Sequence, residues 1–131
     1  MPEYMLDADT VSYSLREHGR VAARIREHSP SDLCISAITL SELRYGAEIR
    51  PSKGIHVQLD RFVSQVEVIP FDQTAADRFA VVAAVLRRKG EPIGIFDTLL
   101  AAQALSLGLV FVTNNAKHFR RVPGLKTENW V

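Results

Sequence analysis

The sequence predicts a single α/β domain, residues 1–131, in which a mostly parallel, twisted central sheet is covered by helices on both faces. The chain has 131 residues, 47% of them hydrophobic and 24% charged. A chain of this length removes roughly two thirds of its surface from water on folding, which is enough for one core without disulfides. Short apolar runs alternate along it with longer stretches of helical spacing. That alternation is typical of a parallel sheet whose strands are joined by helices.

Four short apolar runs, rich in β-branched or aromatic residues, indicate the strands of this sheet. They are residues 4–6, 33–35, 66–69 and 109–112. The single cysteine, Cys34, lies in the second run, so we expect a small buried residue that forms no disulfide within the chain. Nothing in this pattern therefore indicates an oxidising compartment.

The stretches between these runs have the spacing of helices. The clearest extends from Ala75 to Arg88, and Asp72 is expected to cap its start. The stretch from Leu99 to Leu105 is nearly all apolar, so we expect a buried helix there. Breaks are expected at residues 29–31, 50–54 and 90–92. The expected buried face of the first helix consists of Ala76, Phe79, Val82, Ala83 and Leu86.

Composition and patterning argue against several classes of protein. No run of about 18 uncharged apolar residues could span a membrane, and the start of the chain lacks the pattern of a secretory leader, so we expect a cytoplasmic location. The net charge of +1 does not decide the partner, because basic residues can gather on one face. The histidines are scattered, which argues against a structural zinc site; they are His18, His28, His56 and His118.

Acidic residues occur where the predicted strands end. Asp7 directly follows the first run, Glu42 comes soon after the second, and Asp97 precedes the buried helix at 99–105. In a parallel sheet, sites form beyond the carboxyl ends of the strands. Carboxylates that meet there repel one another and raise one another's pKa unless a cation is present. Since Mg²⁺ and Mn²⁺ prefer oxygen ligands, the sequence predicts a site for such an ion.

Each of these acids also has a structural interpretation. Thr39 and Glu42 have the spacing of a capping box, in which each side chain bonds to the other's backbone N–H. Asp97 fits a cap for the helix that follows it, and Asp7 fits a strand that ends in a turn. Taken together these interpretations lose force, because capping does not explain why three acids follow strands that converge at one edge.

The start of the chain leaves two further questions open. Asp9 belongs to the site if the first strand continues through it, whereas it caps or supports a helix if a turn begins at Ala8. Residues 4–11 also fit the start of haloacid-dehalogenase-type phosphatases, in which Asp7 is the nucleophile and Asp9 the acid–base group. That alternative is minor, because the lysine and the acid pair required after a second motif at 110–114 do not follow.

Four blocks of sequence have a more specific likeness, although one block alone would be weak. They are LDADT at 6–10, ISAITLSELRYG at 35–46, IGIFDTLLAA at 93–102 and VTNNAKHFRRVPGL at 112–125. In this order and spacing they resemble PIN-domain ribonucleases, specifically VapC toxins of type II toxin–antitoxin modules. The resemblance covers essentially the whole chain, and it implies a PIN domain over residues 1–131.

The resemblance also implies a set of site residues. Asp7, Glu42 and Asp97 correspond to the acids that hold the metal ion, Mg²⁺ with Mn²⁺ as a substitute. The family often has a fourth acid after the last core strand, where this chain has Asn115, an uncharged amide that can still accept a hydrogen bond. It tends to have Thr-Asn after the first acid, where this chain has Ala-Asp, so Asp9 either compensates for the missing acid or caps a helix.

The partners implied by the resemblance are a VapB-type antitoxin, whose C-terminal segment lies in a groove of the toxin, a second copy of the chain in a homodimer, and structured RNA such as transfer RNA. The expected reaction is metal-assisted, in-line hydrolysis of an RNA phosphodiester that leaves a 5′-phosphate and a 3′-hydroxyl. Asn115 positions a water in this hypothesis, and the RNA backbone is attracted by Lys117, Arg120 and Arg121. The rival hypothesis is a binding module that keeps the fold and lacks turnover, which the amide at Asn115 favours.

Overall fold

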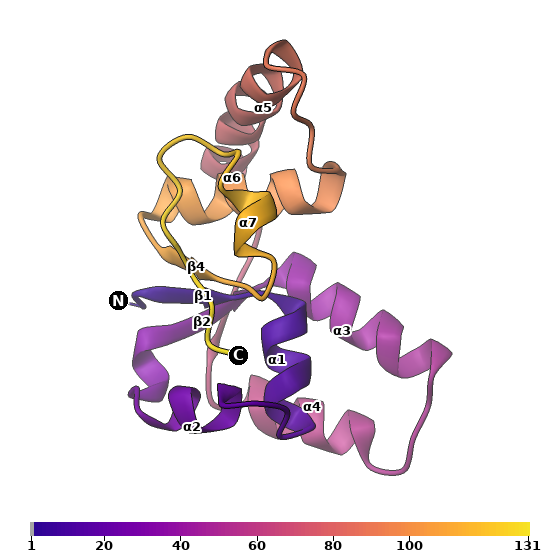
Figure 1. Cartoon of the computed structure of the whole chain (residues 1–131). Coiled ribbons are helices and arrows are strands. Elements are labelled where there is room, and N and C mark those ends of the chain that lie inside the picture. The colour runs from indigo at the N-terminus through magenta and orange to yellow at the C-terminus, as the bar shows by residue number, and fades with distance from the viewer. Residues whose placement is uncertain (1) are drawn as a thin grey trace.

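Five strands form one sheet at the centre of the molecule (Figure 1). The computed structural model describes residues 2–131, and Met1 lies outside the described residues. The strands lie in the order β3-β2-β1-β4-β5, and every neighbouring pair is parallel, which confirms the predicted sheet. Because β1 has neighbours on both sides, its carboxyl end lies at the middle of one sheet edge. The strands are β1 (Tyr4–Leu6), β2 (Leu33–Ser36), β3 (Glu67–Ile69), β4 (Val110–Val112) and β5 (Thr127–Glu128).

Helices cover both faces of the sheet, as predicted. In Figure 1, α5, α6 and α7 lie on one side of the strands, and α1, α2 and α4 lie on the other. Helix α3 contacts α1, α4 and α6, so it lies at the edge between the two layers. The helices are α1 (Ala8–Leu15), α2 (Val21–Arg26), the 3-10 helix η1 (Pro30–Asp32), α3 (Ala37–Ile49), α4 (Ile55–Val63), α5 (Gln73–Arg88), α6 (Ile95–Leu107) and α7 (Ala116–Phe119).

Side chains of the strands point alternately into two cores. Met5 and Phe111 belong to the core beneath α5 and α6, whereas their neighbours Leu6 and Val112 belong to the core beneath α1 and α4. This alternation follows from the pleat of a β-strand. Burial on both faces explains why the strands read as continuous apolar runs. Cys34 is fully buried in the first of these cores, as expected.

Helices α1 and α3 begin directly at the ends of strands β1 and β2, whereas α5 and α6 follow short connections. Ser36, the last residue of β2, caps α3 by accepting a hydrogen bond from the N–H of Ile38 at 3.0 Å. Asp72 caps α5 through the N–H of Ala75 at 2.9 Å, which confirms the predicted cap. Helix α6 instead follows Gly94, whose φ of 96° suits a residue without a Cβ atom. Helices that start at strand ends place their first turns at the carboxyl edge of the sheet.

Some predicted boundaries differ from the structure. Helix α6 begins four residues before the predicted Leu99, because the exposed Ile95 and Phe96 continue the helix beyond its apolar stretch. Ala76 is exposed, and the buried residues of α5 include Ala75 and Leu86. Strand β5 was not predicted, because its two residues contain no apolar run.

Trp130 packs into the core near the end of the chain. It is 1% exposed, and its ring stacks on His28 with ring centroids 4.7 Å apart. The ring is therefore part of the core beneath α1 and α4. Within residues 2–131, no helix combines the length and the apolar character that crossing a membrane requires.

Candidate functional site

Asp7 lies at the carboxyl end of the central strand, where β1 turns directly into α1. It is the N-cap of α1, and its Oδ1 atom accepts a hydrogen bond from the N–H of Ala8 at 2.8 Å. Its Oδ2 atom accepts a second bond from the hydroxyl of Thr113, which follows β4, at 2.9 Å. Both carboxylate oxygens are thus held by groups from two neighbouring strand ends.

Burial and like charges both act on this carboxyl group. Asp7 is 8% exposed, and burial is the main cause that raises its pKa from 3.8 to about 7. Asp9 and Asp97 raise it further, whereas the hydrogen bonds from Thr113 and Ala8 lower it. The three carboxylates are therefore close enough to influence one another.

Asp9 lies in the first turn of α1, so the first strand does not continue through it. It does not cap α1 either, because the N-cap is Asp7. Instead its Oδ2 atom accepts a hydrogen bond from the backbone N–H of Asn114 at 3.2 Å. Burial raises its pKa, and Asp97 adds to the rise. The structure thus places Asp9 beside the predicted site residues.

Glu42 lies within α3, and the capping-box interpretation of this residue is wrong. The cap is Ser36, three residues before Thr39, and Thr39 is fully buried. The Oε1 atom of Glu42 is buried and has no hydrogen-bond partner among the described residues. Burial, Asp97 and Asp9 all raise the pKa of Glu42. This acid is therefore close to the others and has an unsatisfied oxygen.

Asp97 is the third residue of α6, so its interpretation as the helix cap is also wrong; the cap is Gly94. Its Oδ2 atom lies 3.1 Å from Nε2 of His118 on α7. Burial raises the pKa of Asp97, and His118 opposes that rise through its charge and hydrogen bond. Sequence reasoning did not place His118 at the site, because no spacing in the sequence indicates its contact with Asp97.

The remaining predicted site residues lie on the surface around α7. Asn115 is exposed at the start of this helix, and its backbone N–H donates to the Thr113 hydroxyl at 3.0 Å. Lys117 and Arg120 are exposed, and Arg121 donates a hydrogen bond to the carbonyl oxygen of Pro92 at 3.1 Å. These cations are on or next to the helix that carries His118.

Four carboxylates from three separate segments thus gather at one edge of the sheet; we call Asp7, Asp9, Glu42 and Asp97 the four acids. In residues 2–131, no three His, Cys, Asp or Glu side chains are already grouped closely enough to hold a metal ion. The four acids nevertheless fit a hard divalent cation. They offer oxygen ligands, burial and then neighbouring acids raise the pKa of Asp7 and Glu42, and one buried oxygen of Glu42 is unpartnered.

A groove extends from these acids between α1, α3 and α4. Its volume is about 510 Å³, and Asp9 and Glu42 line it together with Arg16 and Arg50. Apolar residues of the lining include Leu59. The groove therefore contains both acidic and basic side chains.

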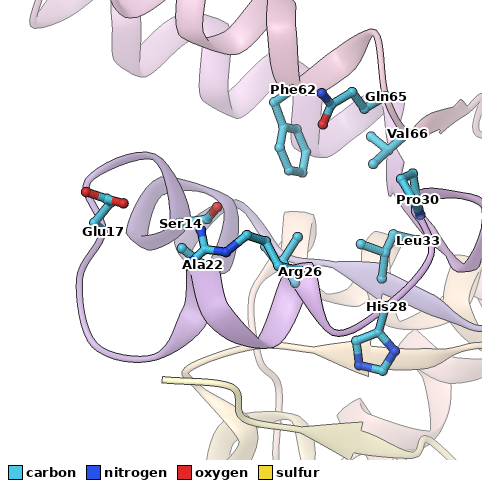
Figure 2. A pocket seen from close by; sticks show the side chains of 11 residues that line it. Ser14, Glu17, Ala22, Arg26, His28, Pro30, Leu33, Phe62, Gln65 and Val66 are labelled. Atoms are coloured by element: carbon cyan, nitrogen blue, oxygen red, sulfur yellow. The ribbon is translucent and has the colours of Figure 1, made fainter.

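A second hollow, of about 390 Å³, lies between α1, α2 and α4 (Figure 2). Figure 2 shows Phe62, Leu33 and Val66 on its apolar side and Arg26 and His28 nearby. None of the four acids lines it. This hollow is thus separate from the site predicted from the sequence.

Comparisons with known proteins identify the family to which the chain is similar. A family model described as PIN domain matches residues 4–125. The tRNA(fMet)-specific endonuclease VapC of Salmonella typhimurium is 40% identical over 135 residues, which cover 99% of each chain. Ribonuclease VapC2 of Haemophilus influenzae is 37% identical, with 100% of each chain covered.

Two solved toxin–antitoxin structures are also similar. One is the DNA-bound VapBC complex of Salmonella typhimurium, in which the matched chain is 38% identical with a TM-score of 0.88 and 100% of each chain covered. The other is VapBC2 of Rickettsia felis bound to a fragment of promoter DNA, with 31% identity, a TM-score of 0.89 and 98% of each chain covered.

Proposed function

Because the chain belongs to the PIN-domain family, and within it to the VapC ribonucleases, we propose that it is a metal-dependent endoribonuclease toxin neutralised by a VapB-type antitoxin. One observation supports this function above the others. Four carboxylates from distant parts of the chain gather at the carboxyl edge of a parallel sheet, where burial and, after it, the charge of neighbouring acids raise the pKa of Asp7, Asp9 and Glu42. The family match replaces the phosphatase alternative, which required a different set of residues after β4.

Asp7, Glu42 and Asp97 are the proposed ligands of the metal ion, Mg²⁺ with Mn²⁺ as a substitute. Such an ion lowers the pKa of water and offsets charge that develops on a phosphate during in-line attack. Glu42 is included because its unpartnered, buried oxygen needs a cation or a donor. Asp9 contributes negative charge beside these ligands, and the exposed Asn115 is proposed to position water through its side-chain amide.

RNA is the proposed substrate, and tRNA(fMet) is the first RNA to test because the Salmonella relative is named for it. The polyanion must approach acidic side chains, so cations have to guide it. Lys117, Arg120 and Arg121 are exposed on or next to α7, the helix that carries His118, and Arg16 and Arg50 line the groove with Asp9 and Glu42. An RNA strand that crosses the acids therefore has cations of both groups nearby.

The antitoxin is proposed to occupy the groove beside Asp9 and Glu42. VapBC complexes among the structural relatives support a VapB partner. A basic side chain of the antitoxin would be attracted to the four acids and would compete with the metal ion there.

We also propose that the chain forms a homodimer and acts in the cytoplasm. Light scattering of the purified protein measures the oligomeric state.

The test of the function is cleavage of defined RNA by the purified chain. Transcribed tRNA(fMet) is incubated with the protein in Mg²⁺ and in EDTA, and the ends of the products are mapped. We expect cleavage in Mg²⁺ alone, with 5′-phosphate and 3′-hydroxyl ends. Cleavage of equal rate in EDTA would refute the role of the metal.

The rival function is a binding module that acts through its antitoxin or by covering RNA, without turnover. The uncharged Asn115 favours it. This rival function is supported if the chain binds RNA in Mg²⁺ but cuts none of the transfer RNAs in a test panel. Co-expression with a candidate VapB-type antitoxin tests the partner, because a cognate antitoxin should form a complex and suppress cleavage.

A further inference from the structure

The segment that follows β4 donates hydrogen bonds to three of the four acids. It contributes a side-chain hydroxyl, a backbone N–H and an imidazole, all within residues 113–118. A single short segment thus orients carboxylates that come from two different helices. The bonds run from Thr113 to Asp7 at 2.9 Å, from Asn114 to Asp9 at 3.2 Å and from His118 to Asp97 at 3.1 Å.

The surroundings of the His118 ring determine which nitrogen carries a proton. Nε2 lies 2.8 Å from the carbonyl oxygen of Ile93 and 3.1 Å from Oδ2 of Asp97. A carbonyl oxygen can only accept, so Nε2 must carry a hydrogen. The same N–H is placed to be shared with the Asp97 carboxylate. His118 is therefore a donor to Asp97.

Packing around α7 holds this imidazole in place. The ring meets the edge of Phe119, with centroids 5.5 Å apart and planes at 89°. Phe119 is 1% exposed and packs in turn against Phe111 of β4, with centroids 4.8 Å apart. The donor is thus fixed by the core beneath α5 and α6.

The orientation of the Asp97 carboxylate depends on one partner, His118, whereas that of Asp7 is held by two hydrogen bonds. Helix α6 begins at Ile95 after the N-cap Gly94, which has no side chain to cap it, and among the described residues His118 is the side chain within hydrogen-bonding distance of the Asp97 carboxylate. A half-buried carboxylate with one donor keeps a single orientation only while that donor is present.

We propose that His118 is a positioning residue, whose Nε2–H holds the Asp97 carboxylate in the orientation that binds the divalent ion. This inference rests on the proposed function and names a further residue of the same site. Removing a side chain that orients a metal ligand typically weakens metal binding by about 10- to 100-fold.

The experiment compares His118→Leu, which removes the donor, with His118→Gln, which keeps an N–H donor at similar reach. His18→Leu is the matched control, because His18 is exposed and packs against Tyr13, away from the four acids. Binding of Mn²⁺ to the free protein is measured by electron paramagnetic resonance without RNA. The Mg²⁺ concentration for half-maximal cleavage and the thermal unfolding of each variant are measured separately.

We expect His118→Leu to weaken Mn²⁺ binding by about tenfold or more and to raise the Mg²⁺ requirement in parallel. The His118→Gln and His18→Leu variants should stay within about threefold of the unmodified protein. If His118→Leu does not fold, His118→Asn takes its place with the same expectation, because its shorter amide cannot reach both acceptors.

Unchanged Mn²⁺ affinity in a folded variant without the donor overturns the inference. Equal losses in His118→Leu and His118→Gln also overturn it, because the shape of the ring rather than its N–H would then matter. The proposed function survives both results if the unmodified chain still binds Mn²⁺ and cuts RNA. A chain that does neither refutes the proposed function, and the positioning role with it.

Discussion

Replacing Asp7 by asparagine should make the protein more stable at pH 8 but not at pH 5. The carboxyl group is 8% exposed, and burial with the nearby charges of Asp9 and Asp97 raises its pKa from 3.8 to about 7. The folded state therefore holds the proton more tightly than the unfolded chain does. Stability falls as the pH rises from about 4 to about 7, and the full cost is present above that range.

The size of the effect follows from the two pKa values. A rise of about 3 units corresponds to roughly 4 kcal/mol at 1.36 kcal/mol per unit. The amide introduced by the Asp7→Asn change cannot accept both bonds from Ala8 and Thr113, which costs about 1–2 kcal/mol. The net gain is about 2 kcal/mol at pH 8, or roughly 8 °C in Tm for a chain of this length. At pH 5 the two effects roughly cancel.

The assay is thermal or urea unfolding in EDTA at both pH values. Asp77→Asn is the control, because Asp77 is exposed on α5. This substitution should change the free energy of unfolding by less than about 0.5 kcal/mol at either pH. Added Mg²⁺ should then stabilise the unmodified protein at pH 8 and leave Asp7→Asn nearly unchanged. A variant that is less stable at pH 8, or that shows the same difference at pH 5, would refute the reasoning.

Three other substitutions test the same site. Asp97→Ala should reduce the rate of Mg²⁺-dependent cleavage by more than about 100-fold, while the protein still unfolds cooperatively. A cleavage rate within tenfold of that of the unmodified protein contradicts the role of Asp97 as a ligand. Glu42→Gln should raise Tm at pH 8, because it removes the charge from a carboxylate whose buried oxygen has no hydrogen bond. The same variant should cleave RNA more slowly at pH 8, and an unchanged cleavage rate excludes Glu42 from the site. Arg16→Gln combined with Arg50→Gln should weaken RNA binding and reduce the slope of log K against log salt by about 2, and an unchanged slope places the RNA elsewhere.

The position of the site could be predicted from the sequence because two simple patterns define it. Asp7 directly follows an apolar run, and Asp97 precedes a helix with almost no polar face. Parallel strands bring such positions to one edge whatever the details of packing, so the prediction tolerated errors of several residues in helix boundaries. Burial is the main cause of the raised pKa of Asp7, and the charges of Asp9 and Asp97 add the expected repulsion.

The local roles of Glu42 and His118 could not be predicted in the same way. Thr39 and Glu42 have the spacing of a capping box, but β2 ends at Ser36 in an extended conformation and α3 starts at once, so Ser36 takes the capping role. The contact between His118 and Asp97 depends on how α7 packs against the start of α6, and no spacing in the sequence encodes that orientation.

The uneven supply of hydrogen bonds divides the four acids into two kinds. Asp7 and Asp97 are each held by donors from the segment after β4, so their orientation is largely set before any ion binds. Glu42 has a buried oxygen without a donor, and no three ligand side chains are yet grouped for a metal in the described chain. A cation that binds the two held carboxylates would therefore offer Glu42 the partner that the protein itself does not provide. If the proposed ion binds, we therefore expect Glu42 to move towards it, whereas Asp7 and Asp97 should keep their positions.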